Sequence, residues 1–265
     1  MAHVAALADR GADLVVLPEL WPCGFDWGSL DEIAADAAEP LDGPRRVALA
    51  ECARAAGIWL AAGSVPERHG GALYNTALLF DPGGRLRAWH RKAHLYQPLG
   101  EADIFAPGDR LTVCPADEFG TVGLTVCFDG DFPEVARGLR TAGATLVIQP
   151  CAYETGAREW WRTLYPAHAL SNAQWWVMAN QCGTNPSGTL LGESQVISPS
   201  GRVLARARGA RDGETPPPEL MTVPVRLAAE LASAEQETDA LRSLRRPGLA
   251  VHTVEDVPAG AGGLV

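Results

Sequence analysis

Short apolar runs separated by turn residues dominate the hydrophobic pattern of this chain. Runs rich in Val, Ile and Leu and bounded by Gly, Pro or polar residues are typical of buried strands, whereas apolar residues spaced three and four apart predict helices. We expect strands at residues 14–17, 59–64, 75–80, 85–90, 121–126, 145–149, 175–180, 194–198, 203–207 and 221–225. We expect helices at residues 2–10, 29–38, 44–56, 133–142, 158–173 and 227–244. This alternation predicts an α/β fold.

Segments rich in glycine and proline divide these elements. Residues 66–71 predict a hairpin loop, and Asp81-Pro-Gly-Gly84 is a strong turn sequence. Residues 92–110 have no periodicity, and a stretch this long suggests a binding loop. Residues 209–219 contain three consecutive prolines and predict a mobile loop, while the tail at 245–265 has little to bury.

The composition is ordinary for a folded protein and limits the possible partners. At 265 residues and 28.1 kDa, with 47% hydrophobic and 20% charged residues, the chain fits a single domain spanning 1–265 with a substantial core. A net charge of −10 argues against nucleic acid or an anionic membrane as the main partner. No apolar run is long enough to span a bilayer, and Asp9, Arg10 and Asp13 interrupt the place of a signal peptide core. We therefore expect a cytoplasmic protein.

The cysteines and histidines do not form a metal-binding pattern. The six cysteines are widely spread, without a Cys-x-x-Cys pair, which excludes the usual zinc spacings and gives no indication of a disulfide framework. His90 and His94 are spaced for one helical face, but no acidic third ligand is near them in the sequence. The chain also lacks the glycine-rich phosphate-binding motifs, so we expect no metal and no cofactor.

Cys127 has the most informative surroundings of the six. The strand 121–126 stops at this residue, 128–132 forms a turn, and Pro133 and Glu134 suit the first turn of a helix. A cysteine at such a corner lies near backbone N–H groups that favour an anion, as a catalytic thiolate requires. A buried structural cysteine is the alternative, and the local sequence does not decide between them.

An internal similarity links two strand ends. Residues 11–19 resemble residues 143–151 almost position for position, each with Gly-Ala, an apolar strand, Pro and then a polar or reactive residue. This similarity suggests two pseudo-equivalent halves that pack together, with Cys151 in the place of Glu19. The alternative is that both segments are a common junction between helix and strand.

Three charged residues complete a possible site for a cysteine hydrolase. Such an enzyme needs a base for the thiol proton and donors for the oxyanion. Glu19 and Lys92 adjoin apolar strands, and Glu101 lies in the following loop. Taken singly, each of these residue types is usually solvated. Their significance comes from their combination with Cys127.

The combined motifs resemble the carbon–nitrogen hydrolase (nitrilase) superfamily, in order and in spacing, over nearly the whole chain. The segments concerned are Leu17-Pro-Glu-Leu20 with Gly24-Phe25, Arg91-Lys-Ala-His-Leu95, Glu101-x-x-x-Phe105-x-Pro-Gly-Asp109, Cys127-Phe-Asp129 with Phe132-Pro-Glu134, Ser171-Asn172, Ala179-Asn180, Gly192-Glu-Ser194 and Pro199-Ser-Gly201. The resemblance implies a four-layer α-β-β-α sandwich and an active site of Glu, Lys and Cys with a second Glu.

Matched by position, Cys127 corresponds to the nucleophile, Glu19 to the general base, Lys92 to the oxyanion-stabilising cation and Glu101 to the supporting glutamate. The backbone N–H of Phe128 is expected to join Lys92 at the oxyanion. We expect Lys92 to lower the pKa of the Cys127 thiol, and apolar neighbours to raise that of Glu19. The reaction would pass through a thioester on Cys127, which a water activated by Glu19 hydrolyses.

The residues that follow Cys127 suggest which type of bond is hydrolysed. Cys-Phe-Asp is similar to the amidase and carbamoylase branches, whereas nitrile-cleaving members tend to have Cys-Trp-Glu. We therefore predict hydrolysis of a small amide or N-carbamoyl compound with release of ammonia. The pocket is expected to include Cys151, Ala152, Tyr153 and Trp160. Nitrile hydrolysis, acyl transfer to an amine and an inactive binding homologue remain alternatives.

The resemblance also indicates a difference at the N-terminus and a homo-oligomer. Superfamily members normally have a further strand and most of a helix before residues 11–16, so the first strand is expected to be missing here. Strand 14–17 is apolar on both faces, a pattern typical of a strand with neighbours on both sides. Without the usual first strand, one side of a sheet is expected to be left unpaired, and residues 1–10 should be poorly anchored. We expect at least a homodimer, with part of 245–265 on the partner.

Overall fold

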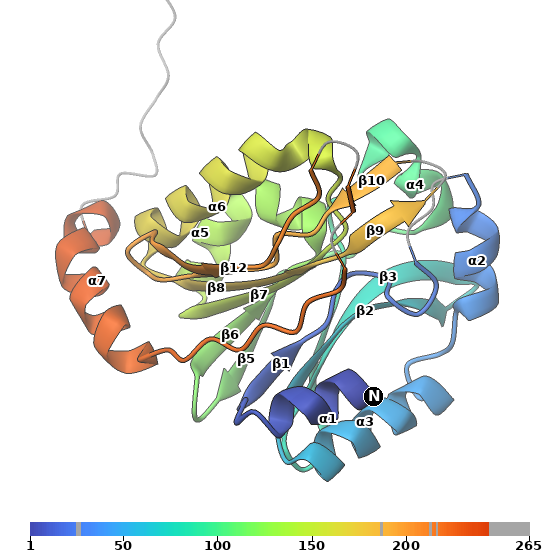
Figure 1. Cartoon of the computed structure of the whole chain (residues 1–265), viewed down its shortest axis with the longest axis horizontal. Helices are drawn as coiled ribbons and strands as arrows, with labels where there is room; N and C mark the ends of the chain where they lie inside the picture. The colour runs from blue at the N-terminus through green and yellow to red at the C-terminus, as the bar shows by residue number, and fades with distance from the viewer. Residues whose placement is uncertain (25–27, 186–187, 212–213, 216, 244–265) are drawn as a thin grey trace, which may run out of the picture.

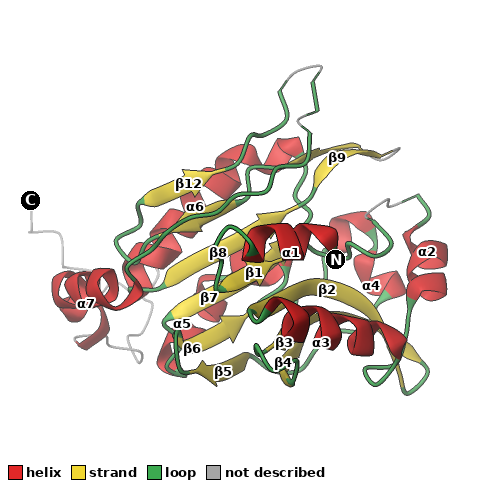
Figure 2. Cartoon of the chain, turned by 60° about the horizontal axis from the view of Figure 1, so that its bottom comes forward, coloured by secondary structure: helices red, strands yellow, loops and turns green. Residues whose placement is uncertain are grey.

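Two β-sheets lie face to face between two layers of helices, as Figures 1 and 2 show. The computed structural model describes residues 1–24, 28–185, 188–211, 214–215 and 217–243. Within these residues, one sheet has four strands in the order β1-β2-β3-β4 and the other has six in the order β12-β11-β8-β7-β6-β5. The expected α/β fold, and the α-β-β-α sandwich implied by the resemblance, are confirmed.

The smaller sheet carries two of the predicted site residues at its strand ends. Its strands are β1 (Leu14–Val16), β2 (Trp59–His69), β3 (Ala72–Phe80) and β4 (Leu86–Arg91). β1 pairs with β2 in parallel, and the other pairs are antiparallel. Glu19 follows the end of β1, and Lys92 follows β4 directly.

β1 lies at an edge of the smaller sheet. Within the described residues β1 pairs only with β2, so its other side is unpaired, which agrees with the expectation for a sheet without a further strand there. Leu14 and Val16 pack on the core between the sheets, while Val15 packs on the helix layer. Both faces of the strand are therefore covered by adjoining layers, and its apolar pattern does not require a second lateral neighbour.

The larger sheet is built around a parallel centre. β6, β7 and β8 pair in parallel, and β5, β11 and β12 add antiparallel strands. The bounds are β5 (Thr112–Ala116), β6 (Gly120–Leu124), β7 (Leu146–Cys151), β8 (Trp175–Asn180), β11 (Gln195–Ile197) and β12 (Val203–Arg206), with a separate ribbon of β9 (Cys182–Asn185) and β10 (Gly188–Leu191). Parallel neighbours need crossover connections, and helices provide them here.

The helices form the two outer layers. The smaller sheet is covered by α1 (Ala2–Ala8) and α3 (Pro44–Ala56), and the larger sheet by α5 (Pro133–Thr141) and α6 (Arg158–Asn172). The remaining helical segments lie at the periphery or in loops: α2 (Leu30–Ala37), α4 (Glu101–Ile104), α7 (Leu227–Ser243) and the 3₁₀ turns η1 (Gln97–Leu99), η2 (Cys127–Asp131) and η3 (Thr155–Ala157).

Local sequence explains where the long helices begin and end. Pro44 and Pro133 occupy the first turns of α3 and α5, where their missing N–H groups have no helical partner in any case. Gly57 ends α3 in the left-handed conformation, at φ 65°. These boundaries agree with the sequence-based predictions to within a residue or two.

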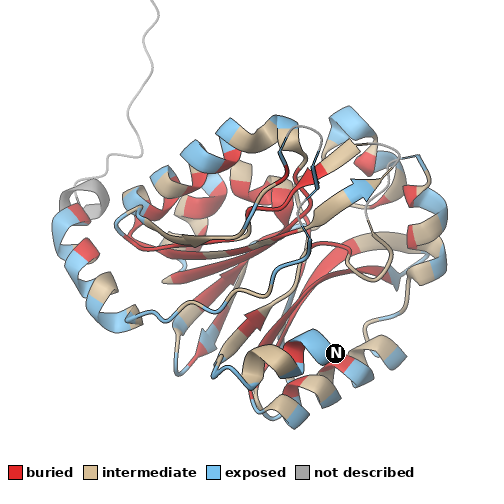
Figure 3. Ribbon diagram, viewed as in Figure 1, coloured by how far each residue is buried: buried red, intermediate tan, exposed pale blue. Residues whose placement is uncertain are grey.

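The buried residues concentrate in the sheets and on the inner faces of the helices, as Figure 3 shows. Trp59 and Leu79 of the smaller sheet share one cluster with Leu124, Ile148 and Trp175 of the larger sheet. Complete burial of a large apolar side chain contributes roughly 1.5–3 kcal/mol. The core between the sheets therefore fixes how the strand ends, and the site residues after them, face one another.

The N-terminal helix is anchored more firmly than expected. Val4 of α1 is 1% exposed and packs in one cluster with Leu49 and Ala53 of α3. The prediction that residues 1–10 are poorly anchored therefore does not agree with the structure.

Several element predictions were wrong for identifiable reasons. β5 was missed because Pro115 is unusual in a strand, but β5 is the last strand of its sheet, where proline is tolerated. β9 and β10 were missed because their sequences are short and partly polar. The predicted strand at 221–225 is not a strand; Met221 and Val223 are apolar because they pack on the core between the sheets. Of the predicted mobile loop at 209–219, residues 212–213 and 216 lie outside the described residues, as does the whole tail at 245–265.

Candidate active site

The two similar strand ends identified in the sequence meet in space. The backbone N–H of Glu19, after β1, donates to the carbonyl of Cys151, the last residue of β7, at 3.4 Å. The side chain of Gln181 also donates to the Glu19 carbonyl. These bonds join the two sheets at one edge. Glu19, Lys92, Cys127 and Cys151 all come from strand ends at this edge.

A buried lysine connects the two predicted glutamates. Lys92 Nζ donates to Glu19 Oε1 at 3.0 Å and to the two carboxylate oxygens of Glu101 at 2.9 and 2.7 Å. All three side chains are at most 1% exposed. Tyr96 N donates to Glu101 at 2.7 Å, which fixes the loop after Lys92 against this carboxylate. The structure therefore brings together three of the predicted site residues.

Asn75 is a member of this group that sequence reasoning missed. Its side-chain nitrogen lies 2.8 Å from Glu19 Oε1 and 3.3 Å from Glu101 Oε1. The residue is 1% exposed and lies on β3, opposite the chain that carries Lys92. A buried amide beside two carboxylates helps to satisfy their oxygens. A polar residue within the apolar strand 75–80 was the available signal.

The charges of this group are unbalanced, because two carboxylates share one ammonium. Burial raises the pKa of Glu19, Lys92 opposes this effect, and the charge of Glu101 adds to it. Burial alone would lower the pKa of Lys92, but Glu101 and Glu19 outweigh it and hold that pKa well above its usual range. Lys92 is therefore positively charged, while Glu19 binds a proton more readily than an ordinary glutamate.

One oxygen of Glu19 is unused. Glu19 Oε2 is buried and has no hydrogen-bond partner in the described part of the chain. A buried acceptor without a partner is costly and calls for an explanation. A carboxylate whose pKa is raised and whose free oxygen lies in a buried site can accept a proton, as a general base must.

Cys127 stands on a strained corner. Its φ is +46°, a left-handed conformation unusual for a residue with a side chain, and η2 begins at this residue. The side chain is 9% exposed. The thiol lies close enough to Glu19 to lower the Glu19 pKa, and it raises the pKa of Lys92.

Burial affects the pKa of the Cys127 thiol more than Lys92 does. Burial raises the pKa of the thiol well above its usual range, a hydrogen bond with Cys151 and the charge of Glu19 raise it further, and Lys92 only partly opposes them. Lys92 does lower this pKa, as expected, but burial, the bond to Cys151 and the charge of Glu19 outweigh it, so the resting group is a neutral thiol.

Asp129 is the second residue that sequence reasoning did not place in the site. This buried carboxylate accepts bonds from His90 Nε2 at 3.0 Å and His94 Nδ1 at 2.9 Å. Backbone N–H groups of Ala93, His94 and Val126 also donate to it at 2.8 to 3.1 Å. Asp129 thereby ties the loop that carries Lys92 to the turn that carries Cys127.

The position of Asp129 also corrects the sequence-based view of the histidines. An acidic residue does lie between His90 and His94, although it is distant in the sequence. Its partners outweigh the effect of burial and hold the pKa of Asp129 below its usual range. No group of three side chains suited to a metal ion occurs within the described residues.

The predicted pocket residues differ in their exposure. Cys151, Ala152 and Tyr153 are at most 9% exposed and continue from β7 beside Cys127, whereas Trp160 is 54% exposed on α6. Gln149 Nε2 lies 3.1 Å from the Cys127 carbonyl and 3.3 Å from Cys151 Sγ, so it connects this strand to the Cys127 corner. Trp161 is fully buried and belongs to the core.

Aromatic rings surround the other side of the Cys127 corner. The Phe128 ring lies 5.0 Å from the Tyr96 ring and 5.1 Å from the Phe132 ring, and His94 stacks on Phe132 at 4.1 Å. These edge-to-face and stacked contacts stabilise the turn against the loop that follows Lys92. They also hold the turn that presents the Phe128 N–H.

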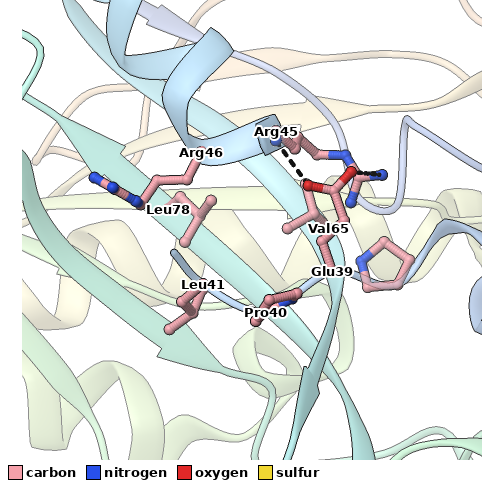
Figure 4. Close-up of a pocket in the computed structure, with 8 residues that line it drawn as sticks. Glu39, Pro40, Leu41, Arg45, Arg46, Val65 and Leu78 are labelled. Carbon is pink, nitrogen blue, oxygen red and sulfur yellow. Dashed lines mark hydrogen bonds and ion pairs between the residues drawn. The ribbon is translucent and has the colours of Figure 1, made fainter. Parts of the chain in front are cut away.

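Two cavities elsewhere do not involve the predicted site residues. The one in Figure 4, about 10 Å³, lies beside the ion pair of Glu39 and Arg45 and has room for a single water at most. A groove of about 690 Å³ lies between α1 and α3 and is lined largely by alanines. Neither contains a residue of the Glu19, Lys92 and Cys127 group.

An α-β-β-α sandwich with a buried Glu, Lys and Cys at one edge of its sheets defines a hydrolase of the nitrilase type. Residues 1–228 match the family model described as carbon-nitrogen hydrolase. The chain belongs to the carbon-nitrogen hydrolase family.

Similar proteins with assigned activities narrow the class of carbon-nitrogen hydrolase to amidases. A hydrolase from Schizosaccharomyces pombe is 36% identical over 214 residues, 76% of this chain, and the chain spans 65% of that protein's length. The 2-oxoglutaramate amidase of Bacillus subtilis is 34% identical over 205 residues, 77% of this chain and 76% of the amidase. Amidase names recur among the relatives, which confirms the predicted class, carbon-nitrogen hydrolases that act on amides.

A solved amidase supplies the structural comparison. A cysteine-to-alanine mutant of the amidase from Nesterenkonia sp. AN1, in complex with butyramide, matches with a TM-score of 0.68 and 31% identity, covering 78% of this chain and 77% of that chain. Another structure of that amidase contains acrylamide added at its active-site cysteine. No helix in the described part of our chain combines the length and apolar character needed to cross a membrane.

Proposed function

We propose that the protein hydrolyses small linear amides, or N-carbamoyl compounds, through a thioester on Cys127, with release of ammonia. The observation that supports this most directly is how Glu19 is hydrogen-bonded and how its pKa is shifted. Lys92 and Asn75 hold one of its oxygens, the other has no hydrogen-bond partner in the described residues, and its pKa is raised beside a neutral thiol. This is the arrangement that a base for a cysteine nucleophile needs.

In the first half of the reaction, Cys127 Sγ attacks the amide carbon while its proton passes to Glu19 Oε2. The carbonyl oxygen becomes an oxyanion, stabilised by Lys92 and the backbone N–H of Phe128. Lys92 has three N–H groups, which contact Glu19 and both oxygens of Glu101, so one of them must leave a Glu101 oxygen to donate to the oxyanion. Glu19 then gives its proton to the leaving nitrogen, and ammonia departs when the carbon–nitrogen bond breaks.

In the second half, water attacks the thioester carbon and Glu19 takes a proton from that water. The same donors stabilise the second oxyanion. The carbon–sulfur bond breaks, the carboxylic acid leaves, and the proton on Glu19 returns to Cys127 sulfur. One amide and one water thus give one acid and one ammonia, and the enzyme is restored.

Glu101 supports this cycle without taking part in bond making. Its two oxygens hold Lys92 Nζ and its backbone loop is fixed by Tyr96. Its negative charge also raises the pKa of Glu19. Both effects favour a charged lysine beside a glutamate that readily accepts a proton.

A panel of butyramide, N-carbamoyl-β-alanine and butyronitrile tests the proposal by ammonia release. We expect turnover of the amide or the carbamoyl compound, and the intact mass of wild-type enzyme quenched during turnover should increase by the acyl group. Cys127→Ala should abolish turnover, and Cys52→Ala, on the outer helix α3, is the matched control that should keep it. Turnover by Cys127→Ala would overturn the mechanism.

Hydroxylamine distinguishes hydrolysis from acyl transfer. If water is the natural acceptor, hydroxylamine should give hydroxamate only in proportion to its concentration. Strong preference for hydroxylamine over water would favour the acyltransferase alternative. Turnover of butyronitrile but neither other compound would favour the nitrilase alternative, and intact folded protein with no acyl adduct would favour the inactive homologue.

A further inference from the structure

A third carboxylate lies beside the nucleophile, outside the group of Glu19 and Glu101. Asp131 ends η2, the turn that begins at Cys127. Its Oδ1 accepts a hydrogen bond from the Tyr165 hydroxyl at 2.6 Å and another from the Tyr153 hydroxyl. The two hydroxyls are 2.7 Å apart. The reaction described above has no role for this carboxylate.

Asp131 is connected to the nucleophile by continuous hydrogen bonds. Tyr165 accepts a bond from Gln149 Nε2 at 2.9 Å, and the same nitrogen lies 3.1 Å from the carbonyl oxygen of Cys127. Tyr153 follows Cys151 and Ala152, the strand end that faces Glu19 across the site. The carboxylate is thus held on the strand-end side of Cys127 that is expected to line the substrate pocket.

The residues around Asp131 become more exposed from the buried tyrosines towards the surface. Tyr165 is fully buried and Tyr153 is 9% exposed, whereas Asp131 is half-buried and Trp160, which bonds to it, is 54% exposed. Asp131 therefore lies between the buried tyrosines and solvent. A substrate that reaches Cys127 on this side meets the carboxylate.

Asp131 has no cationic partner within ion-pair distance in the described part of the chain. The Lys92 charge acts on it from farther away, but Lys92 is bound to Glu19 and Glu101. Burial raises the pKa of Asp131 despite its hydrogen bonds and the charge of Lys92, so its charged form would gain from a second cation nearby.

We infer that Asp131 is a specificity residue that favours amides with a cationic or neutral acyl group and disfavours those with a carboxylate. This inference rests on the proposed function and adds the charge class of the substrate. A carboxylate on the acyl chain would face Asp131 across a partly desolvated pocket, where like charges repel strongly. An ammonium group at the same place would pair with it.

Three amides of similar length test the inference: β-alaninamide, butyramide and succinamate, which are cationic, neutral and anionic at neutral pH. We expect the wild-type kcat/KM to fall in that order. Asp131→Asn should reduce the ratio of the cationic to the anionic substrate by roughly tenfold, with a much smaller change for butyramide. Asp131→Glu keeps the charge and should keep the preference.

Asp117→Asn is the matched control, because it removes the same charge from an exposed position on the turn between β5 and β6, at the other end of β6 from Cys127. It should leave the ratio unchanged. An unchanged ratio in Asp131→Asn, or an equal change in Asp117→Asn, would overturn the inference. Thermal melting establishes that each variant is folded.

Binding provides a readout that does not depend on turnover. Each amide should slow alkylation of Cys127 by iodoacetamide in proportion to its occupancy, followed by intact mass. In the wild type β-alaninamide should protect best and succinamate least, and Asp131→Asn should remove this order. If none of the amides is hydrolysed, the proposed function fails, while the protection order still decides the role of Asp131; the same order in both proteins refutes it.

Discussion

Lys92 Nζ lies 3.0 Å from one oxygen of Glu19, and the second oxygen of that carboxylate has no hydrogen-bond partner within the described residues. The pair is fully buried, and the pKa values of both side chains are raised. The lysine therefore keeps its proton and the glutamate is ready to accept one.

Replacing Glu19 by Gln should separate activity from stability. The amide is nearly isosteric but cannot accept the thiol proton, so we expect kcat to fall at least about a hundredfold. Because burial raises the Glu19 pKa, the ionised carboxylate disfavours folding at neutral pH, and the neutral amide should melt at the same temperature or higher. Ammonia release and thermal melting measure the two effects. Glu51→Gln, at an exposed ion pair, should alter neither, and near-normal kcat in Glu19→Gln would remove Glu19 from the mechanism.

The activity should depend on pH through Glu19. Its folded pKa is raised above 4.5, so kcat/KM should fall as pH decreases through this raised value, where Glu19 becomes protonated and cannot act as a base. Because the Cys127 pKa is well above 9.0, no increase from thiolate formation should appear between neutral and mildly alkaline pH. A pH profile of kcat/KM tests both the expected fall at acidic pH and the expected absence of a rise at mildly alkaline pH. A rise in rate that follows ionisation of a thiol near neutrality would contradict this assignment.

Removing the charge of Lys92 should affect both catalysis and folding. We expect Lys92→Met to reduce kcat/KM by about 3 kcal/mol in transition-state binding, and to cost about 3–5 kcal/mol of stability, because Glu19 and Glu101 lose their buried counter-charge. Adding Glu101→Gln should recover part of the stability but none of the activity. Lys92→Arg should not fully restore kcat/KM, since a planar guanidinium presents its charge differently. Urea unfolding and steady-state kinetics distinguish these results.

Among the six cysteines, Cys127 should be the one whose alkylation stops turnover. Its thiol is neutral at rest and relies on Glu19 for activation, so iodoacetamide should inactivate the enzyme with one modification at Cys127, and more slowly in Glu19→Gln. Chelators should have no effect. Peptide mapping identifies the modified residue. Loss of activity on chelation, or inactivation without modification of Cys127, would require a different mechanism.

Asp129 should be important for both the site and acid stability. Its folded pKa lies below the usual 3.8, so its stabilising effect is present above that value and is lost as pH falls through the lower folded pKa. We expect Asp129→Asn to lose about 3 kcal/mol at neutral pH, because the amide satisfies fewer of the donors around it, and to lose turnover. Urea unfolding below pH 3.8 should show a smaller difference from the wild type. If Asp129→Asn and the wild type differ in stability by the same amount at both pH values, the negative charge of Asp129 is not the cause of the stability loss.

The sequence by itself determined the alternation of strands and helices, because the period of apolar residues and the placement of Gly and Pro act locally. It also placed Cys127 at a corner between a strand and a helix, which the structure shows as a residue at φ +46° before α5. The motifs around Glu19, Lys92 and Cys127 identified the family, and the match over residues 1–228 confirms it.

Tertiary structure decided what depends on burial and on contacts between distant segments. Asn75 meets Glu19 across 56 positions, and Asp129 meets His90 across 39, so neither relationship has a local signal. Lys92 lowers the pKa of Cys127 as expected, but the net pKa is raised because desolvation, which a sequence does not display, outweighs the nearby lysine. The apolar segment 221–225 likewise packs on the core without pairing in a sheet, since the surrounding layers, and not its own pattern, provide its partners.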